Sequence, residues 1–284
     1  MTDPTQPALT LRGPVMIAAF EGWNDAGSAA SQALVHLHAV WAAEHVDELD
    51  PEEYHDFQVN RPQVSLEPDG TRRITWPATS VAVAEPADGG TVVLVPGIEP
   101  SMRWRTYGGG VLAAGGGGGG APALPLGAPP GRAPQSRPTP VTATSDDASL
   151  REALDLDRNT YEGPTGIVGI LGHEARRRGM RALSLWAAVP HYVAHPPSPK
   201  ATLALLARLE EVLGRPIDAG ELAEDAEAWQ LGVDELAAED AEIAEYVAQL
   251  EQAKDTADLP EASGEAIARE FERYLRRRDQ PPGF

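Results

Sequence analysis

The sequence contains no cysteine among its 284 residues. This absence excludes disulfides, thiolate-ligated metals, iron–sulfur clusters and thiol nucleophiles. Long hydrophobic runs are also missing, since no stretch approaches the length of a membrane-spanning helix, and no basic segment followed by an apolar one marks a secretory signal. We therefore expect a cytoplasmic protein that does not enter a membrane.

Basic residues are scarce: 23 of them face 43 acidic residues, for a net charge of −20. Only Lys200 and Lys254 are lysines, a bias that follows GC-rich codons. Because phosphate-binding surfaces depend on arginine and lysine, nucleic acid and anionic membranes are poor partners for such a chain. The acidity is strongest from Glu210 to Glu261, where solvated helices with well-placed charges, or a surface for a basic partner, would explain it.

The rest of the composition is that of a folded protein, with 42% hydrophobic and 23% charged residues. Pro14–Phe20 is an apolar run suited to a buried strand, and Ser28–Ala43 follows it with apolar residues at helical spacing. This pair predicts a βα unit. The length favours one main domain with an appendage.

The alternation of strand-like and helix-like segments continues up to about residue 200. We expect strands at Tyr54–Val59, Val81–Ala84, Thr91–Val95 and Ala182–Ala188, a hairpin within Val64–Trp76 that turns at Pro68-Asp69-Gly70, and a helix at Gly166–Arg178 that ends at Gly179. Strands that alternate with helices predict an α/β sheet covered on both faces.

From Pro199 onward only helices are expected, at Lys200–Leu213, Ala219–Leu231, Val233–Ala253 and Gly264–Arg278. Leu236, Ile243 and Leu250 lie seven residues apart, an imperfect heptad that favours packing in an antiparallel helical hairpin or against a neighbouring subunit. The sequence thus divides into a core domain, residues 1–200, and an acidic helical extension, residues 201–284.

Residues 107–135 are anomalous, because glycine and proline dominate a segment inside the expected core. By composition this segment predicts a flexible linker or loop. A loop of that length is uncommon within a compact domain, so composition and position conflict.

Polar residues follow the first strand, at the place where open α/β sheets hold ligands. Glu21, Asn24 and Asp25 are candidates for a binding pocket, but Asn24 or Asp25 could equally cap the following helix. Neither a GxGxxG pattern nor a phosphate-binding P-loop occurs, so no motif supports nucleotide binding.

Two further groups of candidates lie beyond later strands. Glu99, Arg103 and Trp104 follow the strand at Thr91–Val95 and could bind a polar ligand, or Glu99 and Arg103 could form an internal ion pair. Glu162 and Thr165 precede a helix whose free N–H groups could receive an anion, although the same residues also suit a plain helix entry.

Histidine provides the last candidates. His191, with Tyr192 beside it, could act as a general base, or the proline-rich segment that they begin could close the domain or contact a neighbouring subunit. His36 and His38 lie two apart on a helix and so on different faces. We expect no catalytic triad, no metal and no cofactor.

Four segments together resemble a known family. They are Phe20-Glu-Gly-Trp-Asn-Asp-Ala-Gly27, Gly97-Ile-Glu-Pro-Ser-Met-Arg-Trp104, Tyr161-Glu-Gly-Pro-Thr-Gly-Ile-Val-Gly169 and Ser184-Leu-Trp-Ala-Ala-Val-Pro-His-Tyr192, the last continued by Pro196-Pro-Ser-Pro-Lys-Ala201. From about Val15 to Ala253 the chain is similar to the proteasome assembly chaperone 2 family, in the branch typical of high-GC Gram-positive bacteria.

The resemblance implies a three-layer α/β/α sandwich like that of purine nucleoside phosphorylases, with a C-terminal helical extension. It also implies a homo-oligomer, possibly a trimer, that acts as a non-enzymatic binding or scaffold protein and has proteasome subunits as a candidate partner. An ordinary helix and strand are implied where this sequence has its glycine-rich segment. Some relatives dock through a hydrophobic–Tyr–any residue tail, which the ending Pro282-Gly283-Phe284 lacks. The alternative is a small-molecule binder or enzyme with a phosphorylase-like or hydrolase-like pocket.

Overall fold

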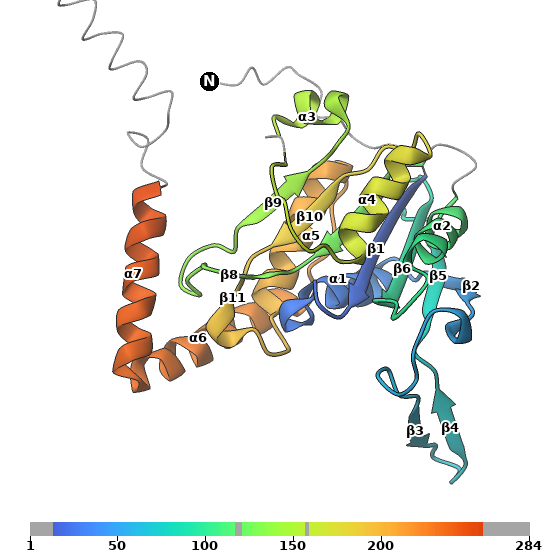
Figure 1. The fold of residues 1–284 in the computed structure, drawn as a ribbon. Helices are drawn as coiled ribbons and strands as arrows, with labels where there is room; N and C mark the ends of the chain where they lie inside the picture. The colour runs from blue at the N-terminus through green and yellow to red at the C-terminus, as the bar shows by residue number, and fades with distance from the viewer. Residues whose placement is uncertain (1–13, 117–120, 157–158, 258–284) are drawn as a thin grey trace, which may run out of the picture.

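The computed structural model describes residues 14–116, 121–156 and 159–257. Its centre is a seven-stranded mixed sheet in the order β2-β5-β6-β1-β7-β10-β9 (Figure 1). These strands are β1 (Val15–Glu21), β2 (Glu44–Leu49), β5 (Thr79–Ala84), β6 (Val92–Ile98), β7 (Ala123–Gly127), β9 (Val141–Thr144) and β10 (Ser184–Ala187). The chain therefore has the α/β class that its alternating pattern predicts.

Strand β1 lies in the middle of the sheet because both of its faces are apolar. Val15, Ile17 and Ala19 belong to one buried cluster, whereas Met16 and its alternate neighbours belong to the other. Such a strand needs cover on both sides. It pairs in parallel with β6 and β7, and β7 continues in parallel to β10. The outer strands β2, β5 and β9 run antiparallel to their neighbours.

Helices supply that cover on each face (Figure 1). On one face α1 (Ala29–Val40) and α5 (Pro199–Leu213) contribute to the first cluster, with Leu150 of the short α3 (Ala148–Leu154). On the other face α2 (Trp104–Ala114) and α4 (Ile167–Arg177) contribute to the second. Helix α5 falls in the predicted extension, yet its side chains are part of this core.

The predicted hairpin forms as β3 (Gln63–Leu66) and β4 (Arg72–Thr75), outside the main sheet. The predicted strand at Tyr54–Val59, in contrast, is wrong. After the short 3-10 helix Pro51–Glu53, this segment is built of turns, because Asp56 accepts hydrogen bonds locally from Gln58 and Val59. Asp side chains favour such turns over strands.

The linker predicted from the composition of residues 107–135 is also wrong, wherever the structure describes that segment. Residues 104–114 form α2, and 123–127 form β7, in which every residue is buried. The short strands β8 (Pro130–Gly131) and β11 (Val189–Pro190) pair beside it. Burial of Tyr107, Val111 and Leu112 against the sheet outweighs the low helix propensity of the glycines between them.

The C-terminal helices are α6 (Leu222–Glu239) and α7 (Ala241–Ala257). They meet at Asp240, which accepts hydrogen bonds from the backbone of Glu242 and Ile243 and so caps α7. The continuous helix expected over Val233–Ala253, with its heptad seam, is therefore wrong. The helix expected at Gly264–Arg278 lies outside the described residues.

Candidate functional site

The carboxyl ends of β1 and β6 meet the start of α4. Strands β1 and β6 are in parallel register, and the backbone N–H of Glu99 donates to the Glu21 carbonyl at 2.9 Å. Glu99 Oε1 in turn accepts from the backbone N–H of Ile167 at 2.9 Å. Because Ile167 is the first residue of α4, this carboxylate caps the helix where its free N–H groups and dipole favour a negative charge.

Gly166 brings Asn24 and Glu99 together in front of α4. A Cβ atom on Gly166 would lie 1.9 Å from Asn24 Nδ2 and 2.7 Å from Glu99 Oε1, so both side chains pack directly on this glycine. Asn24 Nδ2 is buried, and no hydrogen-bond acceptor for it lies among the residues that the structure describes. The arrangement is dense rather than open.

Asp25 caps helix α1, as one of the two sequence interpretations predicts. Its Oδ1 accepts from the backbone N–H of Ala30 at 2.8 Å and of Ser31 at 3.3 Å. Burial raises the pKa of the Asp25 carboxyl, against the opposing effect of these hydrogen bonds. Burial, and then the nearby Asp25, also raise the pKa of Glu21.

The ion pair expected between Glu99 and Arg103 is wrong. The Arg103 guanidinium binds Glu53 instead, with 2.8 Å between Nη1 and Oε2, and lies 5.8 Å from the centre of the Tyr54 ring. The turn that contains Tyr54 packs over the start of α2, because its carbonyl accepts hydrogen bonds from the backbone just before Arg103. Trp104, the first residue of α2, packs against the second core cluster.

The other candidates lie in different surroundings. Glu162 and Thr165 are exposed in the loop before α4. Tyr192 forms hydrogen bonds with Gln135, whose side chain binds Asp234 of α6 at 2.8 Å. The His191 ring contacts a tyrosine of α7, with 5.4 Å between ring centres.

His191 and Tyr192 thus lie at the interface between the core and the C-terminal helices. Lys200 adds to this interface, since its ammonium group donates hydrogen bonds to the Gln135 carbonyl and to the side chain of Gln230 in α6. Burial lowers the pKa of Lys200. The Arg137 guanidinium also makes a bidentate contact with Asp255 of α7, with 2.9 Å between Nε and Oδ1 and 2.7 Å between Nη2 and Oδ2.

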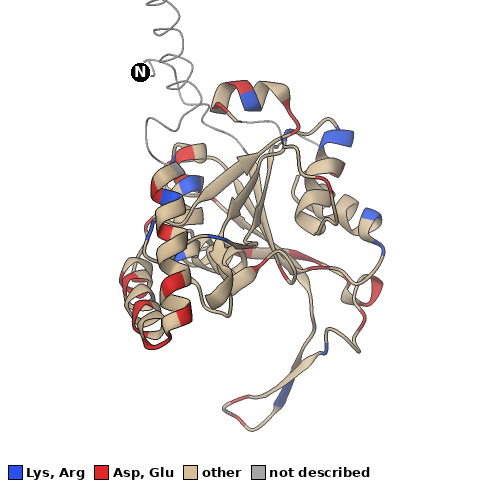
Figure 2. Ribbon diagram, turned by 60° about the vertical axis from the view of Figure 1, so that its left-hand side comes forward, with Lys and Arg blue, Asp and Glu red and all other residues tan. Residues whose placement is uncertain are grey.

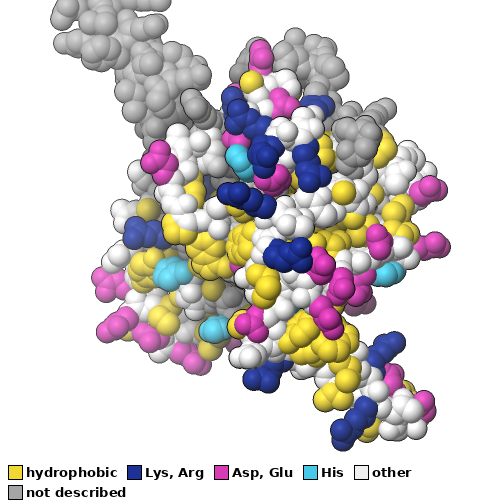
Figure 3. Space-filling model, turned by 45° about the vertical axis from the view of Figure 1, so that its right-hand side comes forward, with side chains coloured by type: hydrophobic (Ala, Val, Ile, Leu, Met, Phe, Trp, Pro, Cys, Tyr) yellow, Lys and Arg dark blue, Asp and Glu magenta, His cyan; other side chains and the backbone are white. Residues whose placement is uncertain are grey.

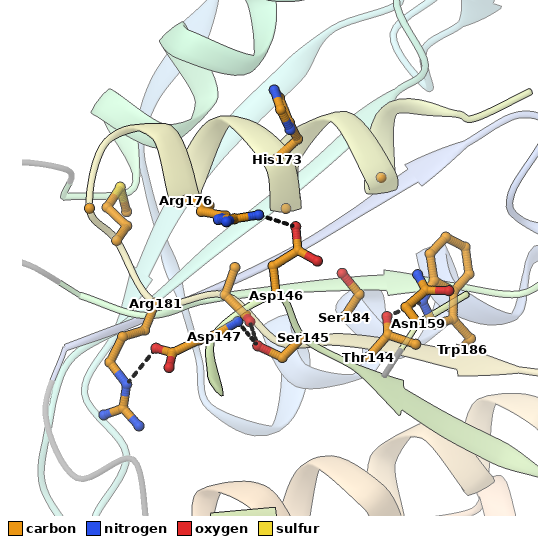
Figure 4. A pocket seen from close by; sticks show the side chains of 15 residues that line it. Thr144, Ser145, Asp146, Asp147, Asn159, His173, Arg176, Arg181, Ser184 and Trp186 are labelled. Carbon is orange, nitrogen blue, oxygen red and sulfur yellow. Dashed lines mark hydrogen bonds and ion pairs between the residues drawn. The ribbon is translucent and has the colours of Figure 1, made fainter. Parts of the chain in front are cut away.

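A cavity of about 300 Å³ opens elsewhere, between α4, the edge strand β9 and its neighbour β10 (Figure 4). Two ion pairs lie along it, Asp146 with Arg176 at 3.6 Å and Asp147 with Arg181 at 3.8 Å. His173 of α4 also lines it. None of these residues was a candidate, because Asp146 and Asp147 follow strand β9, which no local pattern predicts, and the helix that holds His173 and Arg176 gives no sign of what faces it. The glycines of α4 that border the cavity were the available signal.

The described residues also limit the kinds of site that the chain can hold. Within residues 14–116, 121–156 and 159–257, no group of three or more His, Asp or Glu side chains is arranged to hold a metal ion. Over the same residues, no helix has both the length and the hydropathy that crossing a membrane requires.

We expect replacement of Glu99 by alanine to lower the free energy of unfolding by about 1–2 kcal/mol, because the first turn of α4 loses its acceptor. Urea denaturation of the variant and the wild-type protein would measure this. Glu162→Ala is the matched control, since it removes an exposed carboxylate from the loop before the same helix. Equal losses in the two variants would contradict the capping role of Glu99.

Asp25→Asn should change how stability depends on pH. The raised pKa means that the native state holds this proton more tightly than the unfolded chain does, so wild-type stability falls as pH rises through the folded-state pKa. Asparagine keeps the acceptor oxygen but cannot ionise. We therefore expect the stability of the variant, relative to wild type, to improve as pH rises from the ordinary aspartate range through the raised folded-state pKa.

Denaturation curves across that range would test this, with Asp69→Asn as the control. Hydrogen bonds from Thr71 lower the pKa of Asp69, so the control should shift in the opposite direction. The same pH dependence in both variants would contradict the assigned burial of Asp25.

Comparison with known proteins identifies relatives of this chain. Residues 19–237 match the PAC2 family. A PAC2 family protein of Streptomyces avermitilis has 54% identity and a TM-score of 0.78, over 82% of this chain and 99% of that one. A proteasome-assembly chaperone homologue of Mycobacterium tuberculosis has 45% identity and a TM-score of 0.75, with the same coverage of 82% and 99%.

A more distant likeness concerns the fold alone. An archaeal proteasome activator of Pyrococcus furiosus has 18% identity and a TM-score of 0.63, over 81% of this chain and 95% of that one. Among curated proteins there was no significant match. The family match covers most of the chain and agrees with the two actinobacterial structures, so the chain belongs to the PAC2 family.

Proposed function

We propose that this protein is a non-enzymatic, homo-oligomeric binding or scaffold protein similar to proteasome-assembly chaperones. In this proposal the fold is a three-layer α/β/α sandwich related to that of purine nucleoside phosphorylases. Its copies associate, as a trimer by family resemblance, and the acidic helical extension presents a surface to proteasome subunits in the cytoplasm.

The observation that carries the proposal is the position of the Glu99 carboxylate at the start of α4. A helix N-terminus after the carboxyl end of a parallel strand is where an α/β enzyme would bind phosphate. Here the chain's own carboxylate takes that position, 2.9 Å from the Ile167 N–H. Asp25 does the same at α1. Both anion-binding positions are thus filled from within, which favours a structural use of these residues over a phosphorylase-like reaction.

The relatives support the choice of partner. The Mycobacterium tuberculosis structure is described as a proteasome-assembly chaperone homologue, and that relative shares 45% of its residues with this chain over almost its whole length. The C-terminal helices bear the acidic surface that such a partner would contact (Figure 2). Glu239, Glu242 and Glu245 are exposed there.

Affinity capture of the tagged protein from its own cells would test the proposal. We expect mass spectrometry to recover proteasome subunits, and we expect a Glu239→Arg, Glu242→Arg, Glu245→Arg variant to lose them. The matched control reverses the charges of Glu44 and Glu48, which are exposed residues of the edge strand β2. Capture of the protein alone would count against a proteasome partner. Equal recovery of proteasome subunits with all variants would count against the acidic surface of the C-terminal helices as the contact.

A second candidate function is small-molecule binding, favoured by the cavity between α4, β9 and β10. Its ion pairs are long, at 3.6 and 3.8 Å, so their side chains can move to accept a polar ligand. Inorganic phosphate and nucleosides are suitable probes. A rise in melting temperature with a probe, abolished by Arg176→Glu, would favour this function, and no response to any probe would argue against it.

A further inference from the structure

The β3–β4 hairpin has one apolar face that the chain leaves exposed. The register pairs Val64 with Ile74 and Leu66 with Arg72, and directly opposed residues of antiparallel strands point to the same side. Val64, Leu66 and Ile74 are 63%, 74% and 58% exposed. Isolated two-stranded hairpins are marginally stable in water, and a contiguous exposed apolar patch marks a contact surface.

The hairpin stands apart from the core of its own chain. Neither of its strands joins the seven-stranded sheet, and its residues belong to neither core cluster. Figures 1 and 3 show it extending away from the rest of the molecule. At its base Phe57 and Trp76 pack together, with 5.0 Å between ring centres. The apolar face is therefore placed to reach another molecule without disturbing the core.

The charge of the hairpin indicates which kind of surface it can bind. Arg72 lies on the apolar face, opposite Leu66, whereas Ser65 and Arg73 lie on the other face. Face-to-face packing of two hairpins with their turns aligned would bring the Arg72 side chains together, and like charges across such a contact are unfavourable. Packing in the opposite direction would leave each Arg72 without an acidic partner on the facing hairpin face. A suitable surface is apolar and acidic.

Helix α6 has such a surface. Leu231 and Leu236 are 65% and 61% exposed. Glu227 and Glu235 lie one helical turn before and after Leu231, and Glu239 lies one turn after Leu236. The helix contains no lysine or arginine. Leu231 and Leu236 are five residues apart and so lie about 140° apart around the helix. Leu231, with Glu227 and Glu235 on the same face, therefore forms the surface that α6 offers to a partner with aliphatic side chains and an arginine.

The hairpin lies away from α6 of its own chain, since the two stand on opposite sides of the molecule in Figure 1. We propose that the apolar face of the β3–β4 hairpin packs on α6 of a second copy, with Arg72 facing the α6 carboxylates. This inference rests on the self-association in the proposed function and assigns the surfaces for it. Because the two surfaces differ, the contact is heterologous and closes into a ring when the rotation between copies allows.

The test compares the mass of the full-length protein and its variants by sedimentation. Ile74→Glu damages the hairpin face and Leu231→Arg damages the α6 face. Ser65→Glu, an exposed position on the polar face of the same hairpin, is the control. We expect wild type and the control to be oligomeric, and each damaged variant to associate at least about tenfold more weakly and to approach the monomer mass of 30.2 kDa.

Mixing distinguishes a heterologous contact from a symmetric one. In an equimolar mixture, the intact hairpin of Leu231→Arg still fits the intact α6 of Ile74→Glu, so the mixture should form a heterodimer that neither variant forms alone. A mixture that remains monomeric would overturn α6 as the occupant. Unchanged oligomers of the Ile74→Glu variant would overturn the inference but leave the proposed self-association standing. A monomeric wild-type protein would overturn both.

Discussion

Replacing Tyr107 by alanine is expected to lower the free energy of unfolding by about 3–5 kcal/mol. The side chain is fully buried between α2 and the sheet. Its ring makes edge contacts with Phe20 and Tyr54, with 5.9 and 5.2 Å between ring centres. Its hydroxyl lies 2.5 Å from the Thr79 hydroxyl, so truncation leaves both a cavity and a buried polar group with a lost partner.

Thermal and urea denaturation would measure this loss, which corresponds to a fall in melting temperature on the order of 5–10 °C. Tyr107→Phe should lose only about 1–2 kcal/mol, because it keeps the ring and removes the hydrogen bond. Tyr161→Ala is the control, since Tyr161 is exposed. A Tyr107→Ala variant as stable as this control would show that the glycine-rich segment does not pack as α2.

Apolar strands were predictable because their signal is local. The run at Pro14–Phe20 became β1, and Thr91–Val95 became the start of β6, since a fully apolar run of this length has to be buried on both sides. The hairpin turn at Asp69 was also predictable, because an Asp–Gly pair between alternating residues is a turn signal.

The edge of the sheet was not predictable in the same way. β2 has the sequence EHVDEL and is mostly exposed, so burial gives it no apolar alternation. It is a strand because β5 offers it hydrogen-bond partners. In α2 the local signal was misleading. Its glycines indicated a loop, but the packing of Tyr107 and Leu112 on the sheet stabilises a helix.

Within the candidate cluster, capping by Asp25 could be predicted and the partner of Glu99 could not. Aspartate just before a helix has a local use that its residue type indicates. Glu99 binds Ile167, 68 positions away, and Arg103 binds Glu53, 50 positions away. Sequence spacing carries no information on such contacts, which exist only once the sheet brings the loops together.

Gly127→Ala is expected to be the second strongly destabilising change, at about 3 kcal/mol. Gly127 of β7 lies beside Trp186 of β10 in parallel register. A Cβ atom on Gly127 would lie 2.5 and 2.6 Å from two carbons of the Trp186 ring, closer than atoms can pack. The ring cannot easily move, because its Nε1 donates to the hydroxyl of Thr144 at 3.1 Å.

Gly232→Ala is the matched control, because a Cβ atom there meets nothing within 4 Å and the position lies inside helix α6. This change should leave stability unaltered or raise it by up to about 1 kcal/mol, since alanine favours the helix. Urea denaturation of both variants separates a steric need for glycine from a general effect of its flexibility. If Gly127→Ala behaved like the control, the packing of Trp186 on β7 would be wrong. If the Gly127→Ala variant is destabilised as expected, the Trp186 ring requires a glycine at this position. The close approach of strands and helices then explains part of the unusual composition of residues 107–135.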